Sequence, residues 1–288
     1  MQCEPKIATL LAAYNGAAFI DEQIQTILNQ DNVDIRLHIS VDFSEDDTLK
    51  RCLQYQDNDS RVVVLPYGEV YGGAAANFFR LIVDADIGDS EYVALADQDD
   101  IWLPRKLIRA IDVITNSEAD GYSANVMAFW PDGNCRLIKK DFKLKRYDHF
   151  FEAAGPGCTY VLTKEIYFDL RKTIQLKRHD LSRVTLHDWF IYAFCRESKR
   201  SWVIDSEPHM LYRQHDKNQV GSNFGFDAFL KRLKMIGSGW YGTQVELIAK
   251  ILEVQLKGRM WRISSFLQLR RRPRDAFLLL VLHLLFYL

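Results

Sequence analysis

Three aspartates stand close together in this chain, directly after a short apolar segment. The residues are Asp97, Asp99 and Asp100, and they lie between the apolar segment 93–96 and the segment Ile101–Pro104. Carboxylates at the end of a buried strand repel one another and lose hydration, so they favour a bound cation. Mg²⁺ is commonly held by one or two carboxylates together with substrate phosphates. The cluster predicts a divalent metal site, although an acidic turn that caps the next helix is the alternative.

The first part of the chain alternates between apolar segments typical of strands and amphipathic segments typical of helices. The expected strands cover residues 6–13, 35–41, 61–65 and 92–96, and the expected helices cover residues 19–28, 74–83 and 104–114. Strands and helices that alternate at this spacing form right-handed βαβ units. The sequence therefore predicts an α/β fold with a mainly parallel, Rossmann-like sheet flanked by helices.

Several polar or glycine-rich positions follow the expected strands. They are Tyr14, Asp42, Gly72, Gly73 and the aspartate segment 97–100. Ligands of parallel sheets bind beyond the carboxyl ends of the strands. We therefore expect these distant segments to share one edge of the sheet and to form one site.

The second part of the chain is less regular. We expect a hairpin at 126–138, a strand at 160–162, a helix at 186–196, strands at 202–204 and 210–213, and a helix over 224–256 interrupted at 237–239. Serine and cysteine nucleophiles are not expected, because the chain has no Gly-x-Ser-x-Gly motif and Cys158 has no paired base in the sequence.

The composition limits the class of protein. The 288 residues suffice for one large domain, or a domain with an appendage. The net charge of −1 gives no reason to expect a nucleic-acid partner. The five cysteines are scattered without metal-site spacing, which favours reduced thiols in the cytoplasm. The first residues lack the apolar region of a secretory signal.

The C-terminal residues combine basic and apolar side chains. Arginines at 270–272 and 274 precede the segment 276–288, which is apolar except for His283. A spanning helix needs about 20 apolar residues, so this segment is too short to cross a bilayer alone. We expect residues 270–288 to make peripheral contact with an anionic membrane. Docking on the protein itself or on a partner subunit is the alternative.

Five short motifs occur in a fixed order: Ala12–Gly16, Ser40–Ser44, Asp97–Trp102, His187–Trp189 and Tyr212–His215. Together they resemble the family 2 glycosyltransferases of the GT-A fold, particularly the bacterial rhamnosyltransferase-like branch. The resemblance extends over about residues 6–220. It implies a GT-A domain over 1–222, with a nucleotide-binding half 1–105 and an acceptor half 106–222. A helical C-terminal extension with the basic-apolar tail would follow over 223–288.

The resemblance also implies which residues bind the donor and a metal ion. A nucleotide-sugar donor would be bound by Ala12, Tyr14, Asp42, Asn77 and Asp97. Asp97, Asp99 and His215 would hold Mn²⁺ or Mg²⁺, and Asp99 is the better candidate for direct contact with the metal. Such a cation neutralises the nucleoside diphosphate as it leaves.

The resemblance implies that Asp188 is the catalytic base. A carboxylate can accept the proton of an acceptor hydroxyl as the oxygen attacks the anomeric carbon, and one such displacement inverts that centre. Partial burial beside His187 and Trp189 would raise the pKa of Asp188 toward a useful range. Asp188 could also cap the following helix. The candidates on the acceptor side are Trp189, Gly157 and Cys158, although Trp189 is equally compatible with a place in the core.

The loop after the second strand departs from the family pattern, which commonly reads Asp-Asp-Gly-Ser. Val41 replaces the first aspartate and Phe43 replaces the glycine. Phe43 could stack on the nucleotide base, or it could be forced into a strained turn. The departure leaves the nucleotide preference open.

We interpret the sequence as an inverting, metal-dependent glycosyltransferase. Its donor would be a nucleotide sugar, with dTDP-rhamnose favoured, and its acceptor a bacterial cell-surface glycan or a lipid-linked precursor at the inner face of the cell membrane. Two alternatives are a metal-dependent nucleotide-sugar phosphohydrolase and a non-catalytic nucleotide-sugar-binding scaffold. The sequence leaves the oligomeric state open.

Overall fold

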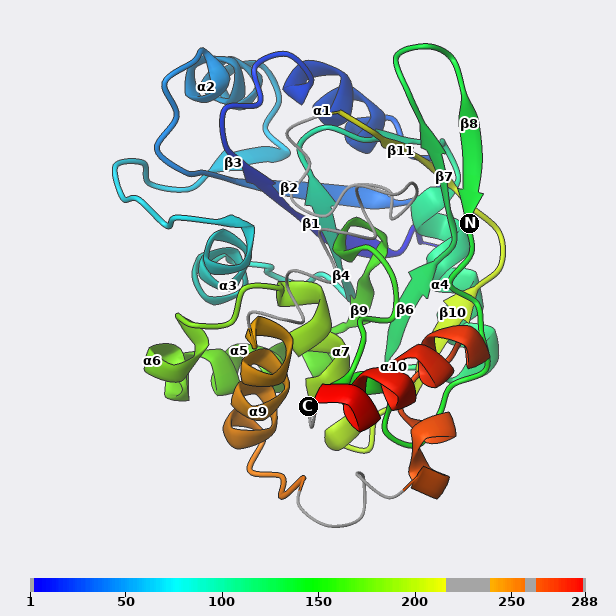
Figure 1. Cartoon of the computed structure of the whole chain (residues 1–288). Coiled ribbons are helices and arrows are strands. Elements are labelled where there is room, and N and C mark those ends of the chain that lie inside the picture. The colour runs from blue at the N-terminus through cyan, green and yellow to red at the C-terminus, as the bar shows by residue number, and fades with distance from the viewer. Residues whose placement is uncertain (1–2, 216–238, 257–262, 287–288) are drawn as a thin grey trace.

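The computed structural model of the chain describes residues 3–215, 239–256 and 263–286. Its centre is a seven-stranded sheet with the strand order β10-β6-β9-β4-β1-β2-β3 (Figure 1). The four strands expected from the sequence are parallel neighbours, namely β1 (Lys6–Ala13), β2 (Asp34–Val41), β3 (Val62–Val64) and β4 (Tyr92–Asp97). The prediction of an α/β fold with a mainly parallel sheet is confirmed.

The other three strands of the sheet come from the second part of the chain. They are β6 (Gly121–Ala124), β9 (Val161–Thr163) and β10 (Trp202–Asp205). β9 runs antiparallel to both β4 and β6, and β6 pairs in parallel with β10. The sequence analysis did not identify β6.

A second, four-stranded sheet has the order β5-β11-β7-β8. Its strands are β5 (Ile101–Trp102), β7 (Val126–Phe129), β8 (Cys135–Ile138) and β11 (Met210–Arg213). β7 and β8 form the expected antiparallel hairpin. β11 pairs with β5 directly after the three aspartates, so this sheet brings residues around 213 to the acidic segment.

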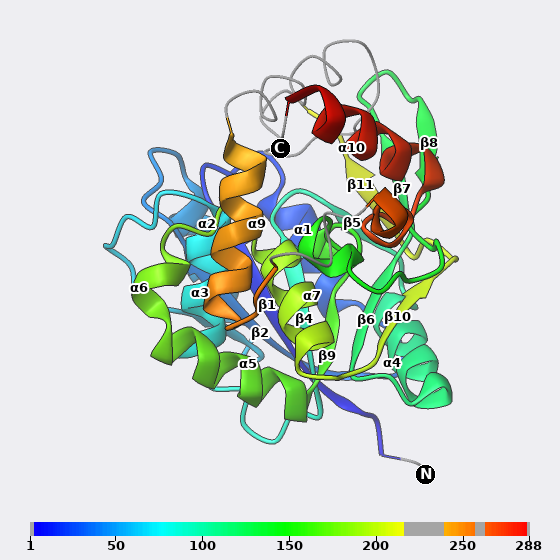
Figure 2. The same ribbon diagram turned by 60° about the horizontal axis from the view of Figure 1, so that its bottom comes forward.

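Helices cover both faces of the central sheet (Figures 1 and 2). One apolar core contains side chains of α1 (Ile20–Leu28), α2 (Thr48–Asn58) and α4 (Lys106–Ser117). The other core contains side chains of α3 (Ala74–Asp84), α5 (Lys164–Leu176), α7 (His187–Glu197) and α9 (Trp240–Ile251), with α6 (Arg178–Leu181) beside them. Neighbouring residues of β1 alternate between the cores, since Leu10 lies in one and Leu11 in the other. Burial on both faces explains why β1 is a nearly continuous apolar run.

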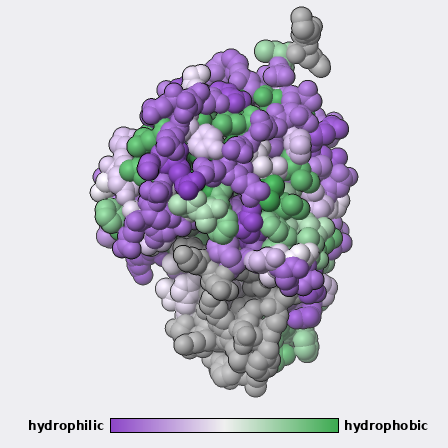
Figure 3. Space-filling view, turned by 90° about the horizontal axis from the view of Figure 1, so that it is seen from above, coloured by the Kyte–Doolittle hydropathy of each residue, from purple (hydrophilic) through white to green (hydrophobic). Residues whose placement is uncertain are grey.

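The expected helix over 224–256 is described only as α9, because residues 216–238 lie outside the described part of the chain. The C-terminal elements are a 3₁₀-helix, η3 (Ile263–Gln268), and α10 (Pro273–Phe286). Among the described residues, no helix combines the length and apolar character needed to span a bilayer. In the face of the molecule seen in Figure 3, most of the visible surface is hydrophilic and the apolar side chains form separate patches.

The arginines before α10 correct one expectation. Arg271 is only 3% exposed, and its side chain donates to the carbonyl oxygens of Ala153 and Ala154. The side chains of Arg270 and Arg272 donate to the carbonyl oxygens of Phe151 and Lys139. Three of the four arginines expected at a membrane therefore face the protein and hold the C-terminal residues to it, whereas Arg274 of α10 is exposed.

The two-sided burial of the sheet predicts the stability of a matched pair of variants. Leu95 of β4 is fully buried, whereas Leu53 of α2 is 40% exposed. We expect Leu95→Ala to lower the free energy of unfolding by about 2–5 kcal/mol, because it leaves a cavity in the core. Leu53→Ala should change it by less than about 0.5 kcal/mol. Urea unfolding of both variants measures the difference, and equal losses would contradict this description of the core.

Candidate active site

The carboxyl ends of β1, β2 and β4 lie side by side. Ala12 of β1 is paired with Ser40 of β2 on one side and with Asp97 of β4 on the other. The segments beyond these strands therefore meet, as expected from the sequence. Ala12 itself is 9% exposed and belongs to the core of the sheet.

Gln98 links the acidic segment to the turn after β1. The backbone N–H of Tyr14 donates to Oε1 of Gln98 at 2.7 Å, and Nε2 of Gln98 donates to the Tyr14 carbonyl at 2.8 Å. A Cβ atom on Gly16 would lie 2.1 Å from the same Oε1, so this close approach requires glycine. The Tyr14 side chain is 56% exposed at the sheet edge, where a ligand could contact it.

Asp42 organises the loop that leads into α3. Its carboxylate accepts hydrogen bonds from the backbone N–H groups of Tyr71 at 2.8 Å and Gly72 at 3.1 Å. Asn77 of α3 accepts a hydrogen bond from the Ser40 hydroxyl and donates to the carbonyls of Ser40 and Ala13. Both predicted donor-binding residues thus fix the backbone around the sheet edge, and both are buried.

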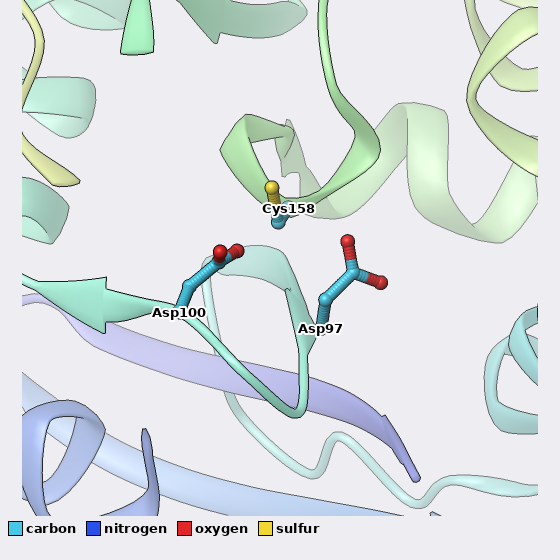
Figure 4. Close-up of side chains that lie close together, drawn as sticks. All are labelled: Asp97, Asp100 and Cys158. Carbon is cyan, nitrogen blue, oxygen red and sulfur yellow. The ribbon is translucent and has the colours of Figure 1, made fainter. Parts of the chain in front are cut away.

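Asp97, Asp100 and Cys158 form a cluster in which Asp97 is half-buried and the other two are buried. One carboxylate oxygen of each aspartate and the Cys158 sulfur lie within 4.8 Å of one another. Figure 4 shows the carboxylates of Asp97 and Asp100 pointing toward Cys158. Oδ2 of Asp100 has no hydrogen-bond partner in the described structure. Burial and the nearby Asp99 and Asp188 raise the pKa of Asp97 to about 7, and burial raises that of Asp100 well above its usual range.

Asp99 and His215 are in direct contact. Nε2 of His215 lies 2.7 Å from Oδ2 of Asp99, and the imidazole stacks on Phe19 at 5.1 Å between ring centroids. Arg213 of β11 donates from Nε to the Asp99 carbonyl at 2.8 Å and from its backbone N–H to Asp100 at 3.2 Å. The second sheet therefore places Arg213 and His215 at the acidic segment.

Asp188 lies in the first turn of α7. Its Oδ1 accepts the backbone N–H of Trp189 at 2.7 Å, but the N-cap residue of α7 is Leu186, so Asp188 is not the cap considered from the sequence. Its Oδ2 accepts no hydrogen bond from the residues that the structure describes. Burial raises the pKa of Asp188 to about 6. A carboxylate with such a pKa can accept a proton near neutral pH.

The 3₁₀-helix η2 (Gly157–Thr159) lies between the acidic cluster and Asp188. A Cβ atom on Gly157 would lie 2.3 Å from Nε2 of His187 and 3.3 Å from Cβ of Asp188, so the fit against α7 requires glycine. His187 stacks on Phe78 at 3.9 Å, and burial lowers its pKa to about 3, which keeps the ring neutral. Gly157 and Cys158 are both buried, and they pack against residues of the site.

Trp189 lies in the core. It is 3% exposed, donates its indole N–H to the His149 carbonyl at 2.9 Å and stacks on Tyr241 at 5.5 Å. These contacts correct its placement on the acceptor side, because both the ring and its donor are already engaged.

Phe43 lies 50% exposed beside the end of β2, and its ring stacks on Tyr67 at 6.2 Å with 16° between the planes. Phe43 has no positive φ, so the family's glycine is not required there and the strained turn is absent. Val41 is buried in the core that contains α1.

Three residues of the site were not singled out from the sequence. Gln98 and Arg213 lie inside the motifs Asp97–Trp102 and Tyr212–His215, but only the fold shows which groups their side chains bind. No sequence motif singled out Lys106. In the structure Lys106 is buried, and its Nζ lies 3.5 Å from the Trp102 ring centroid. Burial lowers the pKa of Lys106 to about 7 despite the nearby carboxylate of Asp100.

The carboxylate oxygens of the site fit a hard divalent cation. Carboxylate oxygens converge at the sheet edge, and one buried oxygen of Asp100 lacks a partner in the described structure. A cation is the group that such oxygens prefer, and Mg²⁺ or Mn²⁺ suits oxygen ligands better than a soft metal does.

Known proteins place this site in a family. A family model described as Glycosyl transferase family 2 matches residues 9–160. A dTDP-rhamnosyl transferase of Shigella flexneri, RfbG, is 41% identical over 96% of this chain and 99% of that protein. The chain belongs to glycosyl transferase family 2 and is a nucleotide-sugar glycosyltransferase.

More distant relatives and solved structures agree with the fold. A glycosyltransferase of Methanocaldococcus jannaschii is 27% identical over 80% of this chain and 75% of its own length. Staphylococcus aureus TarS in complex with UDP-GlcNAc superposes with a TM-score of 0.56 at 14% identity over 86% of this chain and 71% of that one. A Pyrobaculum calidifontis mannosyltransferase with GDP-Man and Mn²⁺ gives 0.54 at 11% identity over 98% and 88%. These structures confirm the GT-A fold.

The raised pKa of Asp188 predicts how stability changes with pH. Between its ordinary value of 3.8 and about 6, the native state binds more protons than the unfolded state, so the Asp188 contribution to stability falls as pH rises. Asp188→Asn removes this titration and keeps the acceptor for the Trp189 N–H. We expect the variant to match the native protein near pH 4 and to exceed its unfolding free energy by up to about 3 kcal/mol at pH 7.5. Urea unfolding at both pH values measures this, and an unchanged difference between them would contradict the burial of the charge.

Proposed function

We propose that this enzyme transfers rhamnose from dTDP-rhamnose to a glycan or lipid-linked acceptor, with inversion of the anomeric centre. The sugar and base are supported by the 41% identity to the Shigella dTDP-rhamnosyl transferase along nearly the whole of both chains. The inverting reaction is supported by Asp188, a carboxylate at the start of α7 whose pKa burial raises to about 6. This carboxylate is the observation that carries the mechanism.

In this proposal, the residues at the carboxyl edge of the sheet hold the donor. Tyr14 and the loop fixed by Asp42 would contact the base and ribose, and the exposed ring of Phe43 would stack on the base. Asp97, Asp99 and His215 would hold Mn²⁺ or Mg²⁺, which supplies positive charge for the diphosphate. The support for a divalent ion is the approach of the Asp97 and Asp100 carboxylates to each other, next to Asp99.

Asp188 would act on the acceptor. Its free Oδ2 would accept the proton of the acceptor hydroxyl while that oxygen forms the new bond to the anomeric carbon, and the bond from that carbon to the diphosphate breaks. Gly157 and Cys158 would flank the acceptor because they pack between Asp188 and the acidic cluster. The neutral His187 below them keeps positive charge away from the carboxylate.

The function is tested by transfer assays with and without an acceptor. We expect dTDP-rhamnose and Mn²⁺ to support transfer to a glycan acceptor, and the rate to increase as pH rises through about 6. Asp188→Asn should lower the transfer rate by about 10²–10⁴-fold, because the proton acceptor is lost. Donor affinity, measured by calorimetry, should be unchanged.

Asp112→Asn is the matched control, since Asp112 is exposed on α4. It should transfer at the native rate. Donor hydrolysis that needs no acceptor would favour a phosphohydrolase, and donor binding without any turnover would favour a scaffold. Native transfer rates in Asp188→Asn would exclude this aspartate as the base.

We also propose that the enzyme works in the cytoplasm, at the inner face of a bacterial membrane. The support is the apolar surface of α10, where Phe277 is 66% exposed and Leu278 is 38% exposed. Ala276 and Leu279 of the same helix are buried and hold it on the protein. The contact would be apolar, because the arginines before α10 face the protein.

Binding to vesicles tests the membrane contact. Phe277→Asp should weaken sedimentation with vesicles of phosphatidylglycerol and phosphatidylethanolamine by about tenfold, since it removes a large apolar side chain from the contact. Phe168→Asp is the control, because Phe168 is 42% exposed on α5, away from α10 (Figure 2). Equal binding by the native protein and the Phe277 variant would exclude α10 as the contact.

A further inference from the structure

Arg271 occupies an unusual position for the C-terminal end of a chain. Its side chain is only 2% exposed and lies inside the GT-A domain. The guanidinium Nη2 donates to the Ala153 carbonyl at 2.6 Å and to the Ala154 carbonyl at 3.3 Å. The Arg271 side chain thus binds the carbonyl groups of two consecutive residues, which precede it by more than a hundred positions in the sequence.

The charge of Arg271 is matched by carboxylates of the same region. Its Nη1 lies 3.7 Å from Oδ2 of the fully buried Asp148, and its Nη2 lies 3.6 Å from Oε2 of Glu152. Its backbone N–H donates to Oε1 of Glu152 at 2.5 Å. Asp148 also accepts hydrogen bonds from Tyr192 at 2.9 Å and Arg196 at 3.1 Å, both in α7. The arginine therefore belongs to a buried network that links the extension to α7.

The segment held by Arg271 leads directly to the active site. Ala153 and Ala154 begin the short run that continues through Gly157 and Cys158. Gly157 is packed against the first turn of α7, and Cys158 lies in the cluster with the acidic residues. A shift of the Ala153 and Ala154 carbonyls would therefore displace Gly157 and Cys158, which follow within five residues.

The neighbouring arginine supports the same segment from a second direction. Arg270 donates to the Phe151 carbonyl and, at 3.1 Å, to the Tyr241 hydroxyl. Tyr241 stacks on Trp189, the residue after the catalytic aspartate. Consecutive residues of the extension thus contact the backbone of the segment that precedes η2.

We propose that Arg271 is a positioning residue for sugar transfer. It fixes residues 153–158 so that Gly157 and Cys158 stay between the acidic cluster and Asp188, where the acceptor enters. This inference rests on the proposed role of Asp188. It gives the C-terminal extension a part in the transfer step, apart from any contact with a membrane.

The structure separates acceptor positioning from donor binding. The turn at Tyr14 is held by Gln98, and the loop before α3 is held by Asp42. Neither set of contacts involves residues 153–158 or Arg271 in the described structure. Loss of Arg271 should therefore slow transfer more than it weakens nucleotide binding, because residues 153–158 reach the donor side only through Cys158 beside Asp97 and Asp100.

Arg271→Met is the main test. Asp148 keeps Arg196 and Tyr192 as partners, so the buried carboxylate is not left alone. We expect kcat for transfer to fall at least about tenfold, because small displacements at an active site cost that much or more. The Kd for dTDP, measured by calorimetry with Mn²⁺, should rise by a smaller factor than kcat falls, since the contacts that fix the Tyr14 turn and the loop held by Asp42 do not involve residues 153–158. Amide hydrogen exchange in residues 154–158 should be faster.

Two further variants complete the comparison. Arg271→Lys keeps the charge but cannot hold two carbonyls in the same way, so its kcat should lie between those of the native protein and Arg271→Met. Arg274→Met should behave as the native protein, because Arg274 is exposed on α10.

A native kcat in Arg271→Met would overturn the proposal, and so would a parallel loss of transfer and dTDP affinity, which indicates general destabilisation. If the native protein transfers no sugar, the proposed function fails. In that case, hydrogen exchange in residues 154–158 still tests whether Arg271 fixes this segment. Unchanged exchange in Arg271→Met would overturn that part of the proposal.

Discussion

The site depends on carboxylates that are crowded where water is scarce. Asp97, Asp99 and Asp100 leave the central strand of the sheet within four residues, and burial together with the neighbouring carboxylates disfavours the charged forms of Asp97 and Asp100. The protein compensates only in part, through His215 on Asp99 and the backbone N–H of Arg213 on Asp100. The remaining repulsion is what a bound divalent cation would relieve, and a ligand that binds only the native state would stabilise the fold.

Polar contacts between segments hold this arrangement in place. Asn77 joins the ends of β1 and β2, Gln98 joins the acidic segment to the turn after β1, and Asp42 holds the loop before α3. The second sheet closes the site from the other side through β11, and the extension reaches it through Arg271. Each contact is made to backbone groups, and such contacts fix the path of the chain more strictly than apolar packing does.

Much of the fold could be predicted from the sequence because its signals are local. Apolar runs and helical spacing gave the four parallel strands and α1, α3 and α4, and the rule for strand ends gave the shared edge. β6 was missed because Gly121–Ala124 is short and weakly apolar, and it is a strand only because β9 and β10 pair with it. Trp189 and Arg271 were misplaced for a related reason: whether an aromatic ring or a cation faces solvent depends on partners distant in sequence, such as Tyr241 and Asp148. Burial of a charge is decided by tertiary structure, which composition cannot show.

The central claim is that these neighbouring carboxylates bind one cation that in turn binds the donor diphosphate. A crystal structure of the enzyme with dTDP and Mn²⁺, with anomalous data that locate manganese, tests this claim most directly. The account predicts one manganese peak in contact with the Asp99 carboxylate and with both phosphates of the nucleotide. Nucleotide bound at the sheet edge with no manganese beside Asp97 or Asp99, or manganese bound elsewhere, would contradict it.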